Sequence, residues 1–137
     1  RAVYEGIAYN IRWILQNFKA DYGFACEDIR IIGGGALDKG WMQILADVTG
    51  RNIHVVENPR NAGAVGAAVV ALIGLGELPD FASAKSFVRV SSTFRPNEAN
   101  GAVYDELFGQ YQQLYRSLSD VYKSANGKRF TQEVVKE

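Results

Sequence analysis

Hydrophobic residues between positions 3 and 18 recur at intervals of three and four, which predicts a helix with one apolar face. The same spacing follows Asp38, a residue type that favours helix N-caps, and stops near Gly50. Residues 62–75, rich in alanine and glycine, are predicted to form a third helix. A long amphipathic helix is predicted between positions 104 and 122, and its apolar side comprises Tyr104, Leu107, Phe108, Tyr111, Leu114, Tyr115, Leu118, Val121 and Tyr122.

Two short runs, 29–32 and 53–56, are rich in β-branched residues and are predicted to be buried strands. Residues 81–87 suit a short helix, and residues 88–94 suit extended or irregular chain. The resulting order of helix, strand, helix, strand, helix and helix predicts an α/β fold. Because a sheet of two strands is marginal and its open edges invite pairing, we expect either further strands in a missing segment or a homodimer.

The composition suits one packed domain, predicted at residues 1–123, followed by a polar tail at residues 124–137. Hydrophobic residues make up 47% of the chain, enough for a core. Its 15 basic residues balance its 15 acidic ones, so charge alone draws it neither to nucleic acid nor to an anionic membrane. No apolar run reaches the roughly 18 residues of a membrane span.

The single cysteine and the first residue bear on the context of the chain. Cys26 has no partner for an internal disulfide, so a reducing, cytoplasmic location is expected. The chain begins with Arg1, and its only methionine is Met42. We therefore expect a segment of a longer protein.

Three consecutive glycines, Gly33, Gly34 and Gly35, separate the first predicted strand from the helix after Asp38. Because glycine has no Cβ, a base or ribose can approach such a main chain closely, and the helix start beyond it favours phosphate. The dinucleotide-binding pattern would need glycine or alanine at position 38, and a P-loop would need lysine where Trp41 stands. A purely structural tight turn is the alternative interpretation of these glycines.

Packing is the favoured explanation for two further patterns. Gly63, Ala67 and Ala71 recur every four residues, which predicts close packing of that helix and an indirect role in holding the glycine turn. The tyrosine-rich side of the last long helix is predicted to cover the sheet, although a stacking surface or a dimer contact would show the same spacing.

Several polar residues are better explained by structure than by chemistry. Asp47 is predicted to form a hydrogen bond or salt bridge at a helix end rather than to act as a catalytic acid. His54 lies in a predicted strand without a Cys or His partner at ligand spacing, so no metal site is expected there. Cys26 is predicted to be a buried or inert thiol. Isolated arginines are usually solvated, although three could meet a phosphate: Arg12, Arg60 and Arg95.

Together, these segments resemble the FGGY family of carbohydrate kinases, and within it the xylulose kinase branch; the family belongs to the superfamily of actin, hexokinase and heat-shock-chaperone ATPases. The resemblance covers roughly residues 1–122, and its matching stretches are 1–8, 33–36, 41–50, 66–68 and 74–76. The family often has Ser or Asn in place of Asp38, and Glu in place of Asn61.

The resemblance implies part of an actin- and hexokinase-type, ribonuclease H-like ATPase domain, with a short sheet flanked by helices. It implies that the complete enzyme transfers the γ-phosphate of ATP, with Mg²⁺, to a sugar hydroxyl, the sugar being a pentulose such as xylulose. The catalytic base and most of the sugar site are then expected in a missing N-terminal domain, so this chain alone is expected to be inactive, with no catalytic residue and no metal ligand. The implied nucleotide contacts are Gly34, Gly35, Ala36, Lys39 and Gln43.

Two interpretations that assign the chain to other classes of function stay open. In the first, the chain is a non-catalytic interaction module, the glycine turn is structural, and the tyrosine-rich helix docks a partner. In the second, the chain is part of a dinucleotide-dependent oxidoreductase. Asp38 argues against this interpretation, because the dinucleotide-binding pattern needs glycine or alanine at that position.

Overall fold

The computed structural model describes the backbone of residues 1–130 and the side chains of residues 1–127. The chain divides into two compact units, one spanning Arg1–Gly101 and the other beginning at Ala102. The first unit contains a three-stranded sheet with its helices, and the second is helical. Among the described residues, no helix combines the length and the apolar character that crossing a bilayer would require.

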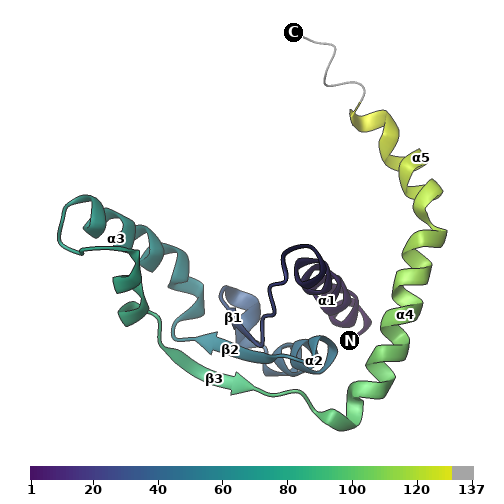
Figure 1. Ribbon diagram of the computed structural model, residues 1–137, viewed down its shortest axis with the longest axis horizontal. Helices are drawn as coiled ribbons and strands as arrows, with labels where there is room; N and C mark the ends of the chain where they lie inside the picture. Colours follow the sequence, from purple (N-terminus) through teal and green to yellow (C-terminus); the bar gives the residue numbers. More distant parts are fainter. Residues whose placement is uncertain (131–137) are drawn as a thin grey trace. The chain divides into compact units, whose positions relative to one another are not determined.

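The sheet has the strand order β1 (Asp28–Ile31), β2 (Asn52–Val56) and β3 (Val90–Phe94), as Figure 1 shows. β1 runs parallel to β2 with Ile29 opposite Ile53, and β3 runs antiparallel to β2. The predicted α/β class is confirmed. The expectation of only two strands is wrong, because β3 is a third. It lies within the run 88–94 that was predicted to be extended or irregular. β3 mostly exposes its side chains, so its sequence lacks the apolar alternation by which a strand is recognised.

Two helices, α1 (Ala2–Tyr22) and α2 (Lys39–Thr49), pack against each other, and α2 also contacts β2. Gly23 and Gly50 end these helices in the left-handed conformation, at φ 66° and 64°, so the predicted stop near Gly50 is confirmed. The largest fully buried side chains come from α2 and β2, and burial of each contributes about 1.5–3 kcal/mol: they are Met42, Leu45, Val48 and Ile53.

The apolar stripe of α1 is only partly buried within the described chain. The helix buries Ala8 and Tyr9. Four large apolar residues of the predicted stripe are exposed instead: Val3, Ile7, Ile14 and Phe18. The helix itself is therefore confirmed, but its apolar face is largely free in the part of the chain that the structure describes.

The third helix, α3 (Ala62–Gly74), follows β2 and packs on a 3-10 segment, Phe81–Phe87. Both helical segments were predicted. The predicted close packing of α3 through its small residues is wrong for the described chain, because Gly63, Ala67 and Ala71 are exposed. A small side chain buries little apolar area, and the buried position of this helix is instead Val69.

The second unit contains α4 (Gly101–Ser117), apart from its first residue, and α5 (Ser119–Phe130), where one long helix was predicted. Tyr104 and Phe108 are buried, so burial of the predicted apolar side is confirmed for the first two turns, while its contact with the sheet stays a prediction. The rest of the predicted stripe is mostly exposed, including Leu114, Tyr115, Val121 and Tyr122. The predicted polar tail starts inside α5, and its residues 131–137 lie outside the described residues.

Candidate functional site

The three glycines after β1 have different structural roles. Gly33 adopts φ 91° and ψ 176°, a conformation that is essentially restricted to glycine, and its N–H donates to the carbonyl of Pro59 at 2.7 Å. The 3-10 turn Gly34–Leu37 follows and buries Ala36. The backbone of the turn therefore requires glycine at position 33.

Gly34 and Gly35 are not required by the described fold. Neither has a positive φ. A Cβ added at Gly34 would lie 3.9 Å from Nε of Arg60, and one at Gly35 would lie 3.7 Å from Nε1 of Trp41. Both are ordinary van der Waals distances, so alanine would fit at either position. Two glycines without a demand from the fold are typical of a main chain that another molecule approaches closely.

Asp38 caps α2 as predicted, and it also links the turn to α1. Its Oδ1 accepts from the N–H of Trp41 at 3.0 Å, and its Oδ2 accepts from the hydroxyl of Tyr4 at 3.1 Å. These bonds lower the pKa of the Asp38 carboxyl, and the bond from the Trp41 N–H has the larger effect. The bond to Asp38 in turn raises the pKa of the Tyr4 hydroxyl. The Tyr4 ring also stacks on Trp41, with centroids 5.0 Å apart.

Gly40 makes room for this cap, because a Cβ there would lie 3.3 Å from Oδ1 of Asp38, closer than most Cβ contacts. Tyr4 was missed by the sequence reasoning. It lies 34 residues before Asp38, and its helical spacing gives no indication of a polar partner.

The other predicted nucleotide contacts lie along the start of α2. Lys39 is the first residue of that helix, directly after Asp38. Gln43 is one turn further, where its amide nitrogen lies 2.7 Å from Oδ1 of Asp47 and 2.8 Å from the carbonyl oxygen of Arg95. The described structure thus uses the Gln43 amide for internal hydrogen bonds, and its contact with a nucleotide stays a prediction, as do those of the turn and Lys39.

Asp47 has the structural role that the sequence predicted for it. Its side chain is buried and accepts from the Gln43 amide, from the N–H of Asn97 at 2.9 Å and from the side-chain amide of Asn100 at 2.8 Å. These bonds hold the segment before α4 against α2, and they engage both oxygens of the carboxylate.

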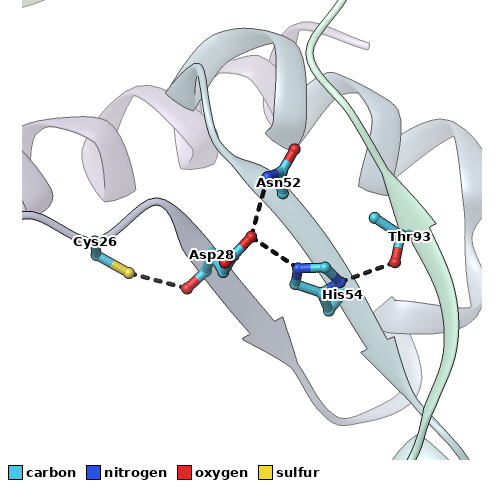
Figure 2. Close-up of polar contacts among 5 residues, drawn as sticks. All are labelled: Cys26, Asp28, Asn52, His54 and Thr93. Carbon is cyan, nitrogen blue, oxygen red and sulfur yellow. Dashed lines mark hydrogen bonds and ion pairs between the residues drawn. The ribbon is translucent and has the colours of Figure 1, made fainter.

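A row of polar side chains crosses the three strands on one face of the sheet (Figure 2). Nε2 of His54 lies 2.9 Å from Oδ1 of Asp28, and its Nδ1 lies 2.8 Å from the hydroxyl of Thr93. With a proton on Nε2, the ring donates to Asp28 and accepts from Thr93. The amide of Asn52 also donates to Asp28, at 3.0 Å, and the thiol of Cys26 donates to the Asp28 carbonyl.

The hydrogen bonds from His54 and Asn52 lower the pKa of the Asp28 carboxyl, and the bond from His54 is the larger cause. The row connects β1, β2 and β3 and thereby supports their register. Within the described part of the chain, no group of three or more His, Cys, Asp or Glu residues could hold a metal ion.

An apolar groove of about 390 Å³ lies beside the glycine turn. Ile32, which precedes the turn, and Val56 border it at the C-terminal ends of the two parallel strands. Ala62, Val65 and other residues of α3 form a second side. Ligands of open α/β sheets bind beyond the C-terminal ends of the strands, so this is the edge where a ligand is expected. Sequence patterns did not predict this groove, because it forms only when β2, α3 and the 3-10 segment come together.

Comparison with known proteins identifies the family. The model of the C-terminal domain of the FGGY family of carbohydrate kinases matches residues 1–75. The autoinducer-2 kinase of Salmonella typhimurium is 36% identical over 117 residues, which cover 85% of this chain and 22% of that protein. The xylulose kinase of Staphylococcus epidermidis is 31% identical over 123 residues, covering 88% of this chain and 24% of that protein.

Solved structures agree with this result. The crystal structure of xylulose kinase from Rhodospirillum rubrum matches with a TM-score of 0.73 and 33% identity, over 89% of this chain and 25% of that one. A ligand-bound xylulose kinase from Lactobacillus acidophilus, at 24% identity, shares the fold with a TM-score of 0.79, over 90% of this chain and 25% of that one. The chain spans about a quarter or less of the length of these relatives. It belongs to the FGGY family of carbohydrate kinases, and residues 1–75 correspond to the C-terminal domain of that family.

Proposed function

We propose that this chain is the nucleotide-binding part of a carbohydrate kinase that transfers the γ-phosphate of ATP to a sugar hydroxyl. The observation that carries the proposal is the presence of glycine at positions 34 and 35, where the described fold does not require it. Family membership supports the reaction class. Relatives named xylulose kinase support a pentulose such as xylulose as the acceptor. Relatives named autoinducer-2 kinase support autoinducer-2 as the competing acceptor.

In this proposal, the main chain of Gly34 to Ala36 contacts the adenosine of ATP. The apolar groove beside Ile32 offers a surface for the flat base, since bases bury apolar area when they bind. Lys39 and Gln43 reach the ribose or the base from the first turns of α2. A contact through Gln43 requires its amide to exchange the internal bonds to Asp47 and Arg95 for the ligand.

The phosphates and their Mg²⁺ need further groups. The described residues offer no cluster of acidic side chains for a metal, so Mg²⁺ is proposed to bind through the nucleotide phosphates and other parts of the enzyme. Bound ATP supplies the phosphoryl group. This chain's part in the reaction is to hold the nucleotide in one position, which is a large share of catalysis in phosphoryl transfer.

We further propose that an N-terminal domain supplies the sugar site and the catalytic base, so that this chain alone is inactive. Two facts support this. The chain spans only 22–25% of its relatives, and the first unit exposes large apolar residues on α1 and at the end of β1, such as Ile7, Phe18 and Ile32. Such residues favour coverage by another domain or, as the alternative, by a second copy of the chain. A cytoplasmic location is proposed with the kinase activity.

The test is an amide NMR titration of the 137-residue chain with ADP and, separately, with NAD. We expect ADP to shift the signals of residues 33–43 and NAD to leave them in place. Gly35→Val should abolish these shifts while the chain keeps its dispersed spectrum. A folded wild-type chain that responds to neither ligand would overturn nucleotide binding, a preference for NAD would favour an oxidoreductase, and sugar phosphorylation by the chain alone would contradict the proposed location of the base.

One observation favours a second candidate function, that of an interaction module. The exposed stripe of α4 and α5 contains two tyrosines whose rings pack against each other, Tyr115 and Tyr122, with centroids 5.8 Å apart. Replacing Leu114 and Val121 by serine should leave nucleotide shifts unchanged in a kinase. In an interaction module, the same change would abolish partner binding while Gly35→Val would leave it intact.

A further inference from the structure

Arg60 lies in a short turn whose backbone is hydrogen-bonded to the glycine turn. It lies in the 3-10 turn Pro59–Asn61, which the left-handed Asn58, at φ 47°, introduces. The carbonyl of the buried Pro59 accepts from the N–H of Gly33 at 2.7 Å, so the two turns are bonded directly to each other. The backbone of Arg60 therefore has a fixed position relative to the turn.

The side chain of Arg60 lies beside Gly34. Its Nε lies 3.9 Å from the point where a Cβ of Gly34 would stand. Arg60 is exposed, and within the part of the chain that the structure describes no carboxylate lies within ion-pair distance of it. Asp38, the acidic residue that follows the turn, already accepts from Trp41 and Tyr4. Arg60 can thus move without breaking a salt bridge.

The surroundings of Arg60 suit a flat, uncharged group better than a phosphate. Ala62, two residues further on, and Ile32, directly before the turn, both line the apolar groove. A guanidinium is planar and weakly hydrated, and it stacks on aromatic rings. A glycine peptide likewise offers a flat surface without a side chain. Gly34 and Arg60 therefore offer two flat surfaces between which an aromatic ring system could stack.

We propose that Arg60 stacks on the base of the bound nucleotide. In the free chain its Nε lies beside Gly34. On binding, the side chain moves away, the base takes its place against the turn, and the guanidinium covers the other face of the base. This inference rests on the proposed nucleotide function and adds to it a residue that determines affinity for the base. Arginine was expected from the sequence to be solvated at this position.

The test compares adenosine with ADP, using the 137-residue chain and three variants. Arg60→Ala removes both the plane and the charge, and Arg60→Lys keeps the charge without the plane. Arg51→Lys is the matched control, because Arg51 lies beyond the other end of α2. Dissociation constants come from NMR or calorimetric titration, and the circular dichroism spectrum of each variant verifies its fold.

We expect Arg60→Ala and Arg60→Lys to weaken adenosine and ADP binding by the same factor, about tenfold, with Arg51→Lys like the wild type. If Arg60→Lys binds adenosine like the wild type and only Arg60→Ala loses ADP, Arg60 contacts phosphate and the stacking proposal is wrong. If both variants bind both ligands normally, Arg60 has no role at the site. If the folded wild type binds neither ligand, the nucleotide function itself fails, a result distinct from the other two.

Discussion

The carboxylate of Asp47 accepts a 2.8 Å hydrogen bond from the side-chain amide of Asn100, which lies 53 residues later in the chain. Its other oxygen accepts from the N–H of Asn97. One buried carboxylate thus attaches the segment between β3 and α4 to the last turns of α2. The same helix carries the glycine turn at its other end, so the position of that turn depends on packing at both ends of α2.

We expect Asp47→Ala to lower the free energy of unfolding by about 2–4 kcal/mol, because it leaves the Asn97 N–H and the Asn100 amide without their acceptor. Urea unfolding followed by circular dichroism measures the change. The control is Asp21→Ala in the exposed last turn of α1, which should change stability by less than about 0.5 kcal/mol. Equal stability of both variants would show that the Asp47 bonds do not hold this segment.

The three glycines should separate into two classes on substitution. Gly33→Ala places a Cβ in a conformation restricted to glycine and should cost about 1–3 kcal/mol of stability. Gly34→Ala and Gly35→Ala meet only ordinary contacts, so each should unfold within about 0.5 kcal/mol of the wild type.

For the same two variants, affinity for ADP should fall about tenfold or more, since an added methyl group occupies the space of the ligand. Urea unfolding and NMR titration measure the two effects on the same samples. Normal ADP binding by both stable variants would mean that the main chain of Gly34 and Gly35 does not contact the nucleotide.

Local signals in the sequence predicted the elements better than their surroundings. The intervals of three and four located α1 and α2, and Asp38 marked the start of α2 correctly because a cap depends only on residues three positions away. β3 was missed because Val90–Phe94 faces mostly solvent and has no apolar alternation. Burial was also misjudged: the small-residue face of α3 and much of the stripe of α1 are exposed, since periodicity shows that a face is apolar but not what covers it.

The site was predicted only as far as the main chain of the turn. Glycines and a capping aspartate are visible in sequence because their backbone requirements are local. The neighbours of the turn come from distant parts of the chain: Tyr4 contributes a hydroxyl from α1, and Pro59 a carbonyl from the turn after β2. No spacing rule connects these residues to Gly33, so only the fold shows them together.

Acid should destabilise the sheet through Asp28. Its pKa is lowered in the folded chain, so its ionised form contributes stability that is complete above the ordinary value of about 3.9 and is lost as the pH falls through the folded value. The first cause of that shift is the hydrogen bond to His54. We therefore expect urea unfolding of His54→Gln to depend less steeply on pH below about 4 than that of the wild type.

Thr93→Val is the matched comparison for this effect. It removes the hydroxyl partner of His54 Nδ1 but leaves the contact between His54 and Asp28 in place. Its acid dependence should therefore follow the wild type, although its stability can be lower at every pH. If His54→Gln and the wild type lose stability in parallel below pH 4, the row across the strands does not set the pKa of Asp28.

Tyr4→Phe isolates the hydroxyl that links α1 to the cap of α2. The phenylalanine ring can still stack on Trp41, but Oδ2 of Asp38 loses its donor. The pKa of Asp38 should therefore rise toward its ordinary value without reaching it, because the Trp41 N–H, the first cause of the lowering, remains. A ¹³C NMR titration of the Asp38 carboxyl measures this directly, with Tyr22→Phe, at the exposed end of the same helix, as the control. An unchanged Asp38 titration in Tyr4→Phe would mean that the two side chains are not bonded in solution, and that α1 holds the turn only through the ring stack.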